Sequence, residues 1–187
     1  MTLSHALFPS MTRWTQVLLV LGGTLLIAVA AQIRVPMLPV PMTLQTLAIL
    51  IIGFTYGARL GAATLFVYLA EGAMGLPVFA GGGATLAYMM GPTGGFLIGF
   101  LGMAWLAGLA ADRGVAKGFV STSLVALAVS ALLYIPGLIW PAAMMGKTWD
   151  VLWLHWMSPF LAGDAVKAVL AALIVTGGWA VLKARRG

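Results

Sequence analysis

Long apolar stretches, separated by short groups of glycine, proline and charged residues, make up most of this sequence. An α-helix that crosses a bilayer needs about 20 mainly apolar residues, so a chain of 187 residues has room for roughly six such helices. We place them at about residues 14–32, 42–56, 60–72, 91–111, 118–140 and 160–182. The pattern predicts one transmembrane domain over residues 1–187.

Three of the connections between these stretches have an unusual composition. Val35–Pro41 is a proline-rich turn, and the glycines of Gly75–Gly83 preclude an ordinary helix there. Pro141 is expected to end the fifth stretch. The segment Trp149–Trp156 is expected to be an aromatic loop at a membrane interface, where tryptophan is enriched.

Composition supports an all-α integral membrane protein. Hydrophobic residues make up 62% of the chain and charged residues 7%, with a mean hydropathy of +1.07. Water-soluble domains usually have about 25% charged residues, so that class is excluded. No extramembrane domain of useful size fits beside the apolar stretches, and any activity is expected within the helical bundle.

The net charge of +6 is scattered between the apolar stretches and forms no basic stripe, so we expect no nucleic-acid partner. Instead the basic residues predict orientation, because they favour the cytoplasmic side. One side would hold Arg13, Arg59, Arg113, Lys117, Lys183, Arg185 and Arg186, and the other Arg34 and Lys147. Both termini are therefore predicted to be cytoplasmic in a multi-pass protein of a bacterial-type cell (inner) membrane, with the three unusual connections outside.

The first stretch also imitates a signal peptide, since Arg13 precedes an apolar run that ends in Ala28-Val29-Ala30. The run is long enough to span the membrane, and cleavage would leave five helices and disturb the charge pattern. We expect this stretch to be retained.

Known catalytic and metal patterns are not found. The sequence has no cysteine, and His5 and His155 lie far apart without acidic neighbours, so we expect no metal site and no cofactor. Gly146-Lys147-Thr148 ends like a phosphate-binding loop, but Pro141 stands where that loop needs glycine and no strand precedes it. The chain is not expected to hydrolyse ATP or to be an enzyme.

Asp164 and Lys167 are the only charged residues between about residues 160 and 182. Three positions apart on a helix, their side chains share one face with Cβ atoms roughly 5–6 Å apart. Charges inside a membrane span mark functional sites by default. The alternative is that Lys167 extends to the nearer interface and Asp164 only neutralises it. We expect a buried polar contact for a solute, open to the outside.

Four motifs occur in order along the chain: Pro41-Met-Thr43-Leu-Gln45-Thr46-Leu, Gly75-Leu-Pro77-Val-Phe79-Ala-Gly81-Gly82, Gly91-Pro92-Thr93-Gly94-Gly95-Phe96-Leu-Ile-Gly99-Phe100 and Gly163-Asp164-Ala-Val-Lys167. Together they resemble the BioY family, the biotin-specific S components of energy-coupling factor (ECF) transporters. The resemblance implies a compact six-helix S-component bundle that captures biotin from outside. It also implies partnership with a transmembrane T component and two cytoplasmic ABC-type ATPases.

The resemblance assigns the polar ligand contacts to Asp164 and Lys167. It leaves open whether the ureido head or the carboxylate of biotin faces these two residues. Further candidates follow from the chemistry of biotin. Phe79 and Tyr88 either pack on the rings of biotin or belong to the ordinary packing of the bundle. Gly82 and Gly83 are expected to let the backbone approach the ligand closely. Thr43 and Gln45 either line the pocket or are polar residues at the start of a helix.

Thr24 and Ala28 form a small-x-x-x-small pair in the first stretch, where the T component would dock. Glu71 either pairs with Arg34 or lines the pocket. Gly94, Gly95 and Gly99 are expected to permit close helix packing.

Two other functional classes stay open at this point. The first is a stand-alone secondary transporter or facilitator of a small organic acid or vitamin, with Asp164 and Lys167 in a proton relay. Such carriers commonly contain internal repeats, and the sequence has no convincing one. The second is a membrane scaffold that binds no solute, which tight solute binding would exclude.

Overall fold

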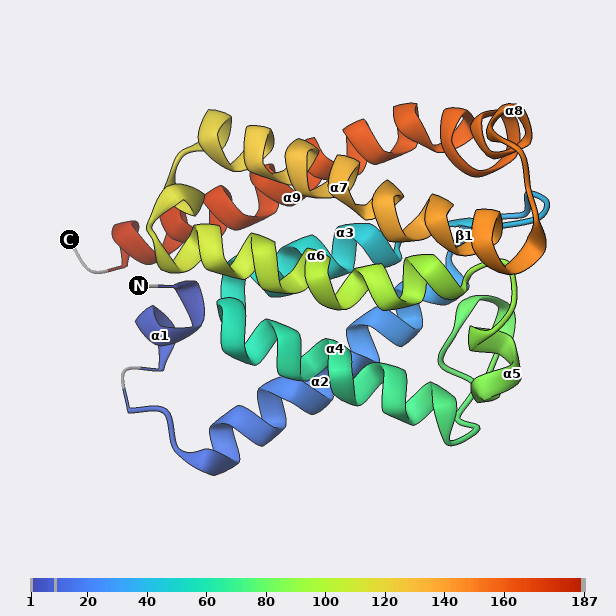
Figure 1. Ribbon diagram of the computed structural model, residues 1–187. Coiled ribbons are helices and arrows are strands. Elements are labelled where there is room, and N and C mark those ends of the chain that lie inside the picture. Colours follow the sequence, from blue (N-terminus) through green and yellow to red (C-terminus); the bar gives the residue numbers. More distant parts are fainter. Residues whose placement is uncertain (1, 9, 186–187) are drawn as a thin grey trace.

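The computed structural model describes residues 2–8 and 10–185, and within them the chain is almost entirely helical (Figure 1). The helices are α1 (Leu3–Leu7), α2 (Arg13–Gln32), α3 (Gln45–Tyr56), α4 (Ala58–Ala73), α5 (Thr85–Met89), α6 (Gly94–Asp112), α7 (Phe119–Met145), α8 (Trp149–Leu152) and α9 (Ser158–Ala184). Shorter elements are the strands β1 (Arg34–Val35) and β2 (Met42–Thr43), the 3-10 turns η1 (Ala80–Gly82) and η2 (Val115–Lys117), and the π-helical turn η3 (Trp153–Met157). The all-α prediction is confirmed.

Helix α6 lies at the centre of the bundle, in contact with α3, α4 and α7 (Figure 1). Helix α9 packs on α7 and α3, and α2 lies against α4 and α3. Glycine permits the closest of these approaches, because a Cβ on Gly95 would collide with the carbonyl oxygen of Pro136 on α7. Gly95 is thus a packing position, as the sequence indicated.

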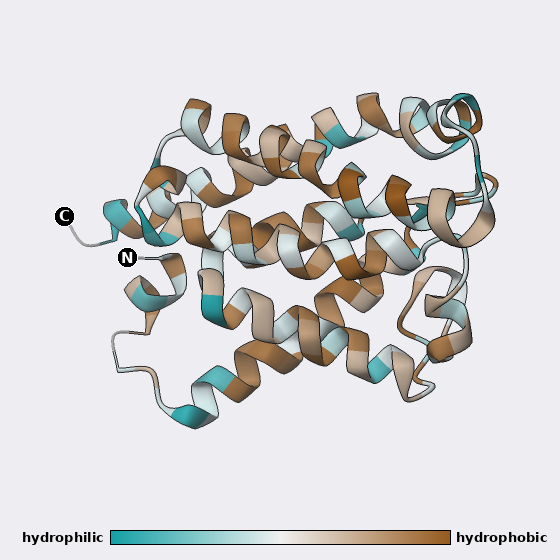
Figure 2. Ribbon diagram, viewed as in Figure 1, coloured by the Kyte–Doolittle hydropathy of each residue, from teal (hydrophilic) through white to brown (hydrophobic). Residues whose placement is uncertain are grey.

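Within residues 2–8 and 10–185, four helical segments are long and apolar enough to cross a membrane: α2, α6, α7 and the run Trp149–Ala184. Helix α3 has 12 residues and α4 has 16, so both are shorter than a usual span. Figure 2 shows apolar residues through most of the length of the long helices and hydrophilic residues mainly near their ends. This distribution is typical of a membrane-embedded bundle.

The irregular segments gather at one end of the bundle. Figure 1 shows β1, α5 and α8 at one end, and α1 together with the last turns of α9 at the other. Strand β1 pairs antiparallel with β2, with Arg34 opposite Thr43, so the proline-rich turn forms the tip of a hairpin. Arg186, one of the basic residues used to predict orientation, lies outside the described residues.

Three local expectations are wrong. Helix α3 begins at Gln45 rather than Met42, because Met42 is in β2 and pairs with Val35. Helix α7 passes through Pro141 and ends at Met145, since a membrane helix tolerates the missing N–H when neighbouring groups satisfy the freed carbonyl. The segment from Trp149 to Trp156 is helical, formed by α8 and η3, and runs directly into α9.

Candidate functional site

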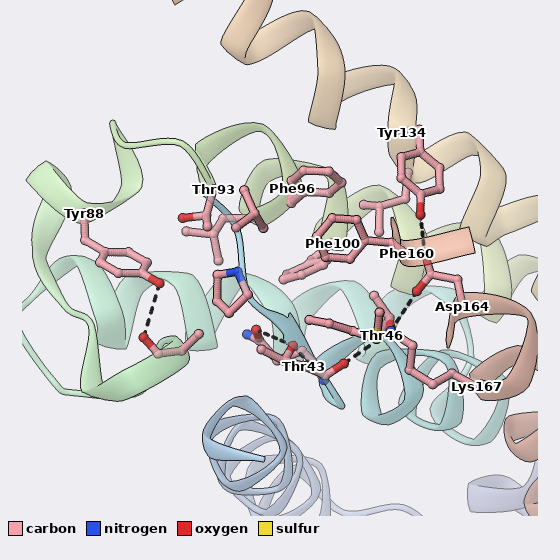
Figure 3. Close-up of a pocket in the computed structure, with 17 residues that line it drawn as sticks. Thr43, Thr46, Tyr88, Thr93, Phe96, Phe100, Tyr134, Phe160, Asp164 and Lys167 are labelled. Atoms are coloured by element: carbon pink, nitrogen blue, oxygen red, sulfur yellow. Dashed lines mark hydrogen bonds and ion pairs between the residues drawn. The ribbon is translucent and has the colours of Figure 1, made fainter. Parts of the chain in front are cut away.

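A pocket opens between the β1–β2 hairpin and helices α3, α6, α7 and α9, with η1 and α5 at its side (Figure 3). It holds about 560 Å³ of empty space, open solvent at its mouth included. Its walls are mainly apolar, with Phe96, Phe100 and Phe160 among them. One part of the wall carries the polar side chains of the hairpin, α3, α7 and α9, and Tyr88 and Thr93 lie on the other side of the pocket (Figure 3).

The ion pair of Asp164 and Lys167 lies in this wall. The Oδ1 of Asp164 is 2.7 Å from Nζ of Lys167, and the two residues are only 9% and 6% exposed. Nζ also donates a hydrogen bond of 3.2 Å to the carbonyl oxygen of Thr43. Lys167 therefore points into the protein, and the alternative in which it extends to the interface is wrong.

Tyr134 on α7 completes the environment of the carboxylate, because its hydroxyl donates a hydrogen bond to Oδ2 of Asp164. Both carboxylate oxygens thus have a donor, one charged and one neutral. A buried charge is stable only when paired and hydrogen-bonded in this way. The pair as a whole is electrically neutral but strongly polar.

Thr43 and Gln45 lie on the pocket wall and also organise the start of α3. The backbone N–H of Gln45 donates to Oγ1 of Thr43 at 3.2 Å, and that hydroxyl donates to Oε1 of Gln45 at 3.0 Å. The side-chain amide of Gln45 donates to the hydroxyl of Tyr68, which donates to the carbonyl oxygen of Val78 at 2.9 Å. The pocket and helix-start interpretations of these residues are both consistent with the structure.

Tyr88 lines the pocket, and Phe79 supports it from behind. The two rings are stacked, with centroids 5.4 Å apart, and the Tyr88 hydroxyl donates to the carbonyl oxygen of Ala80 at 3.3 Å. Phe79 is fully buried in the core and is not among the residues that line the pocket. Its ring lies against Gly72, which leaves the space that a side chain would occupy. The expectation of a direct ring contact therefore suits Tyr88 and not Phe79.

Gly82 and Gly83 shape the loop beside the pocket rather than its lining. Gly82 has a φ of +74°, which favours glycine, and its N–H donates to Oε1 of Gln32 at 3.1 Å. The amide of Gln32 donates in turn to the carbonyl oxygen of Phe79 at 3.0 Å. Gly83 lies against the ring of Tyr88 with no room for a Cβ. Gln32, which the sequence did not single out, thus ties the glycine loop to α2.

Thr24 and Glu71 contact each other on neighbouring helices. The Thr24 hydroxyl lies 3.2 Å from Oε1 of Glu71 and 3.1 Å from the carbonyl oxygen of Leu21. Glu71 is not among the pocket-lining residues, and among the described residues it forms no ion pair with Arg34, so both roles considered for it are wrong. Thr24 is buried and faces α4, whereas Ala28 is half-buried.

Tyr134 and Thr46 are polar pocket residues that the sequence did not identify. Tyr134 is 30 positions from Asp164, and only the packing of α7 on α9 brings them together. Thr46 directly follows Gln45 in the first of the four motifs that resemble the BioY family, and this position is the one sign in the sequence that it lines the pocket. Among the described residues no group of three or more His, Asp or Glu side chains is arranged to hold a metal ion.

Comparison with known proteins gives consistent matches over most of the chain. A sequence model of the BioY family matches residues 4–184. The probable biotin transporter BioY of Pyrococcus horikoshii is 38% identical over 149 residues, covering 80% of this chain and 86% of the relative. The biotin transporter BioY of Rhizobium etli is 36% identical over 158 residues, covering 79% and 84%.

A solved structure agrees with the sequence comparisons. The crystal structure of the S-component for biotin from an ECF-type ABC transporter superposes with a TM-score of 0.76 at 25% sequence identity. The match covers 95% of this chain and 96% of that chain. The bundle described above is thus similar to that S-component along nearly its whole length.

Proposed function

Since the chain belongs to the BioY family, we propose that it captures biotin and serves in biotin transport as the substrate-specific subunit of an ECF-type importer. The observation that supports this most directly is the pocket, a mainly apolar and aromatic cavity whose wall holds the buried Asp164–Lys167 ion pair. The stand-alone transporter and the scaffold are not favoured, because the relatives are biotin transporters and the solved match is an ECF S-component.

Biotin has the chemistry that such a pocket can bind. Its bicyclic head combines a ureido group, with two N–H donors and a carbonyl, and a thioether ring, and its aliphatic tail ends in a carboxylate. We place the ureido head at the Asp164–Lys167 pair, because a neutral polar group suits a pair that has no net charge. The rings then pack against aromatic side chains such as Phe96 and Tyr88. The carboxylate lies toward the open mouth, where water solvates it.

The proposed arrangement in the membrane has six crossings. Helices α3 and α4 would complete the set formed by the four longer segments, with both ends of the chain in the cytoplasm and the pocket mouth outside. The positions of Arg13, Arg59 and Arg113 at the starts of α2 and α4 and at the end of α6 support this orientation. We place the protein in the inner membrane of a bacterial-type cell.

ATP hydrolysis would be left to partner subunits, a T component and two ABC-type ATPases. The proposal is consistent with the lack of a phosphate-binding loop in this sequence. We propose the outer face of α2 as the docking surface for the T component, since Leu18, Leu21, Leu25 and Val29 are exposed there. Ala28 borders this face, whereas Thr24 supports it from inside through Glu71.

Calorimetry of the purified chain in detergent tests the proposal, with biotin as the titrant. We expect tight binding by the wild type and a loss of about 1.5–3 kcal/mol in Asp164→Asn and Lys167→Met, the magnitude of a hydrogen bond to a charged group. Lys147→Met is the matched control, because Lys147 is exposed and outside the pocket. Absence of biotin binding by folded wild-type protein would refute the proposal.

Transport assays separate the importer from the stand-alone transporter. In vesicles that contain the chain alone, we expect little biotin uptake, and in vesicles that also contain the T component and both ATPases we expect ATP-dependent uptake. Equal uptake in the two preparations would favour a self-sufficient transporter.

A further inference from the structure

We infer that Thr46 is a specificity-determining residue whose hydroxyl binds the ureido head of the ligand, an inference that rests on the proposed function. Thr46 lies on α3 and lines the pocket (Figure 3). Its Oγ1 is buried and has no hydrogen-bond partner among the described residues. A buried hydroxyl without a partner costs free energy, so a ligand that supplies the partner recovers that cost.

The absence of a partner has a specific structural reason. A threonine inside a helix usually donates to the carbonyl four residues earlier, as Thr64 does to Leu60 at 2.8 Å and Thr122 to Gly118 at 2.6 Å. Thr46 is in the first turn of α3, and the residue four positions earlier is Met42 in strand β2. No helical carbonyl is therefore present at that position to accept from Thr46.

Comparable unpartnered hydroxyls among the described residues lie outside the pocket. Ser123 and Ser130 on α7 also have buried Oγ atoms without a partner among the described residues. Neither serine is among the residues that line the pocket, whereas Thr46 is. Of these three residues, Thr46 is the one that lines the pocket.

The other polar groups of the pocket leave a role for this hydroxyl. Both oxygens of Asp164 already accept hydrogen bonds, and Lys167 is shared between Asp164 and the carbonyl oxygen of Thr43. The amide of Gln45 is bound to Tyr68. Thr46 follows three residues after Thr43, whose carbonyl oxygen accepts from Lys167, and Thr43 and Thr46 both line the pocket. A ureido head placed at the ion pair therefore lies next to a hydroxyl that is free to donate or accept.

Thr46→Val tests the inference, because valine keeps the shape of threonine and removes the hydroxyl. Measured by calorimetry in detergent, we expect the Kd for biotin to rise about tenfold, which corresponds to about 1.4 kcal/mol. Thr46→Ser, which keeps a hydroxyl, should stay within about threefold of the wild type. The midpoint of thermal unfolding without ligand should be unchanged or higher in Thr46→Val, since an unpartnered buried polar group is removed.

Two matched controls separate binding from folding. Ser130→Ala removes an unpartnered hydroxyl outside the pocket, so the biotin Kd should match the wild type and the unfolding midpoint should not fall. Thr122→Val removes a hydrogen-bonded hydroxyl outside the pocket, so the midpoint should fall and the Kd should not change.

Biotinamide identifies which end of the ligand contacts Thr46, because it keeps the ureido head and lacks the carboxylate. We expect Thr46→Val to weaken biotin and biotinamide by the same factor. A factor seen with biotin alone would place the hydroxyl at the carboxylate and overturn the assignment. An unchanged Kd for biotin in folded Thr46→Val would also overturn it, while leaving the proposed function intact. Absence of binding by the wild type would instead refute the proposed function, and this inference with it.

Discussion

Replacing Lys167 with methionine should destabilise the ligand-free protein strongly. Lys167 is 6% exposed, forms the 2.7 Å ion pair with Asp164 and donates to the carbonyl oxygen of Thr43. Methionine fills a similar volume but leaves the carboxylate of Asp164 with Tyr134 as its remaining donor. Breaking a buried ion pair from one side costs about 3–5 kcal/mol, because an uncompensated charge stays buried. We expect a loss of that size in the free energy of unfolding.

The double variant Asp164→Asn with Lys167→Met should lose less stability than the sum of the two single variants. Both charges are then absent, so no uncompensated charge is buried, and the coupling between directly contacting partners is typically about 0.5–3 kcal/mol. Thermal unfolding in detergent, followed by circular dichroism at constant pH for all four proteins, measures this coupling. Losses that add within about 0.5 kcal/mol would refute the view that each residue neutralises the other.

Three further predictions concern packing, loop anchoring and orientation. Gly95→Ala should destabilise the bundle by about 1–3 kcal/mol in thermal unfolding because its Cβ meets a carbonyl oxygen of α7, whereas Gly102→Ala, in open space, should be neutral or slightly stabilising. Gln32→Leu removes two hydrogen bonds to the glycine loop and should speed biotin dissociation about fivefold in stopped-flow measurements. An unchanged rate would contradict the view that Gln32 anchors this loop to α2. Because the sequence has no cysteine, Leu38→Cys should react with a membrane-impermeant thiol reagent from outside and Val115→Cys should not, and the reverse pattern would invert the proposed orientation.

Features that depend on neighbours in sequence could be predicted. Asp164 and Lys167 share one helix face at a spacing of three, so their contact follows from helix geometry alone. The turn at Val35–Pro41 follows similarly from proline, which restricts the backbone and cannot continue a helix, whereas the pairing of β1 with β2 beside it was not predicted. The all-helical class follows from apolar composition, because a bilayer requires backbone groups to be satisfied within each segment.

Features that depend on packing between distant segments could not be predicted. Tyr134 meets Asp164 only because α7 packs on α9, and Gln32 meets the glycine loop across about 50 positions. The path of α7 through Pro141 depends on its surroundings, since proline stops a helix in water more readily than in a bundle. For Phe79 the sequence allows either packing on the rings of biotin or ordinary bundle packing, and only the structure places its ring against Gly72.

The neutrality of the Asp164–Lys167 pair has an electrical consequence for transport. Moving one elementary charge across a potential of 100 mV involves about 2.3 kcal/mol of work. If the site held one unpaired charge, the membrane potential would favour or oppose any movement of the site across the membrane by about that amount of work. The ion pair presents a dipole instead of a net charge. The membrane potential therefore acts on the carboxylate of the cargo and hardly at all on the site that holds it.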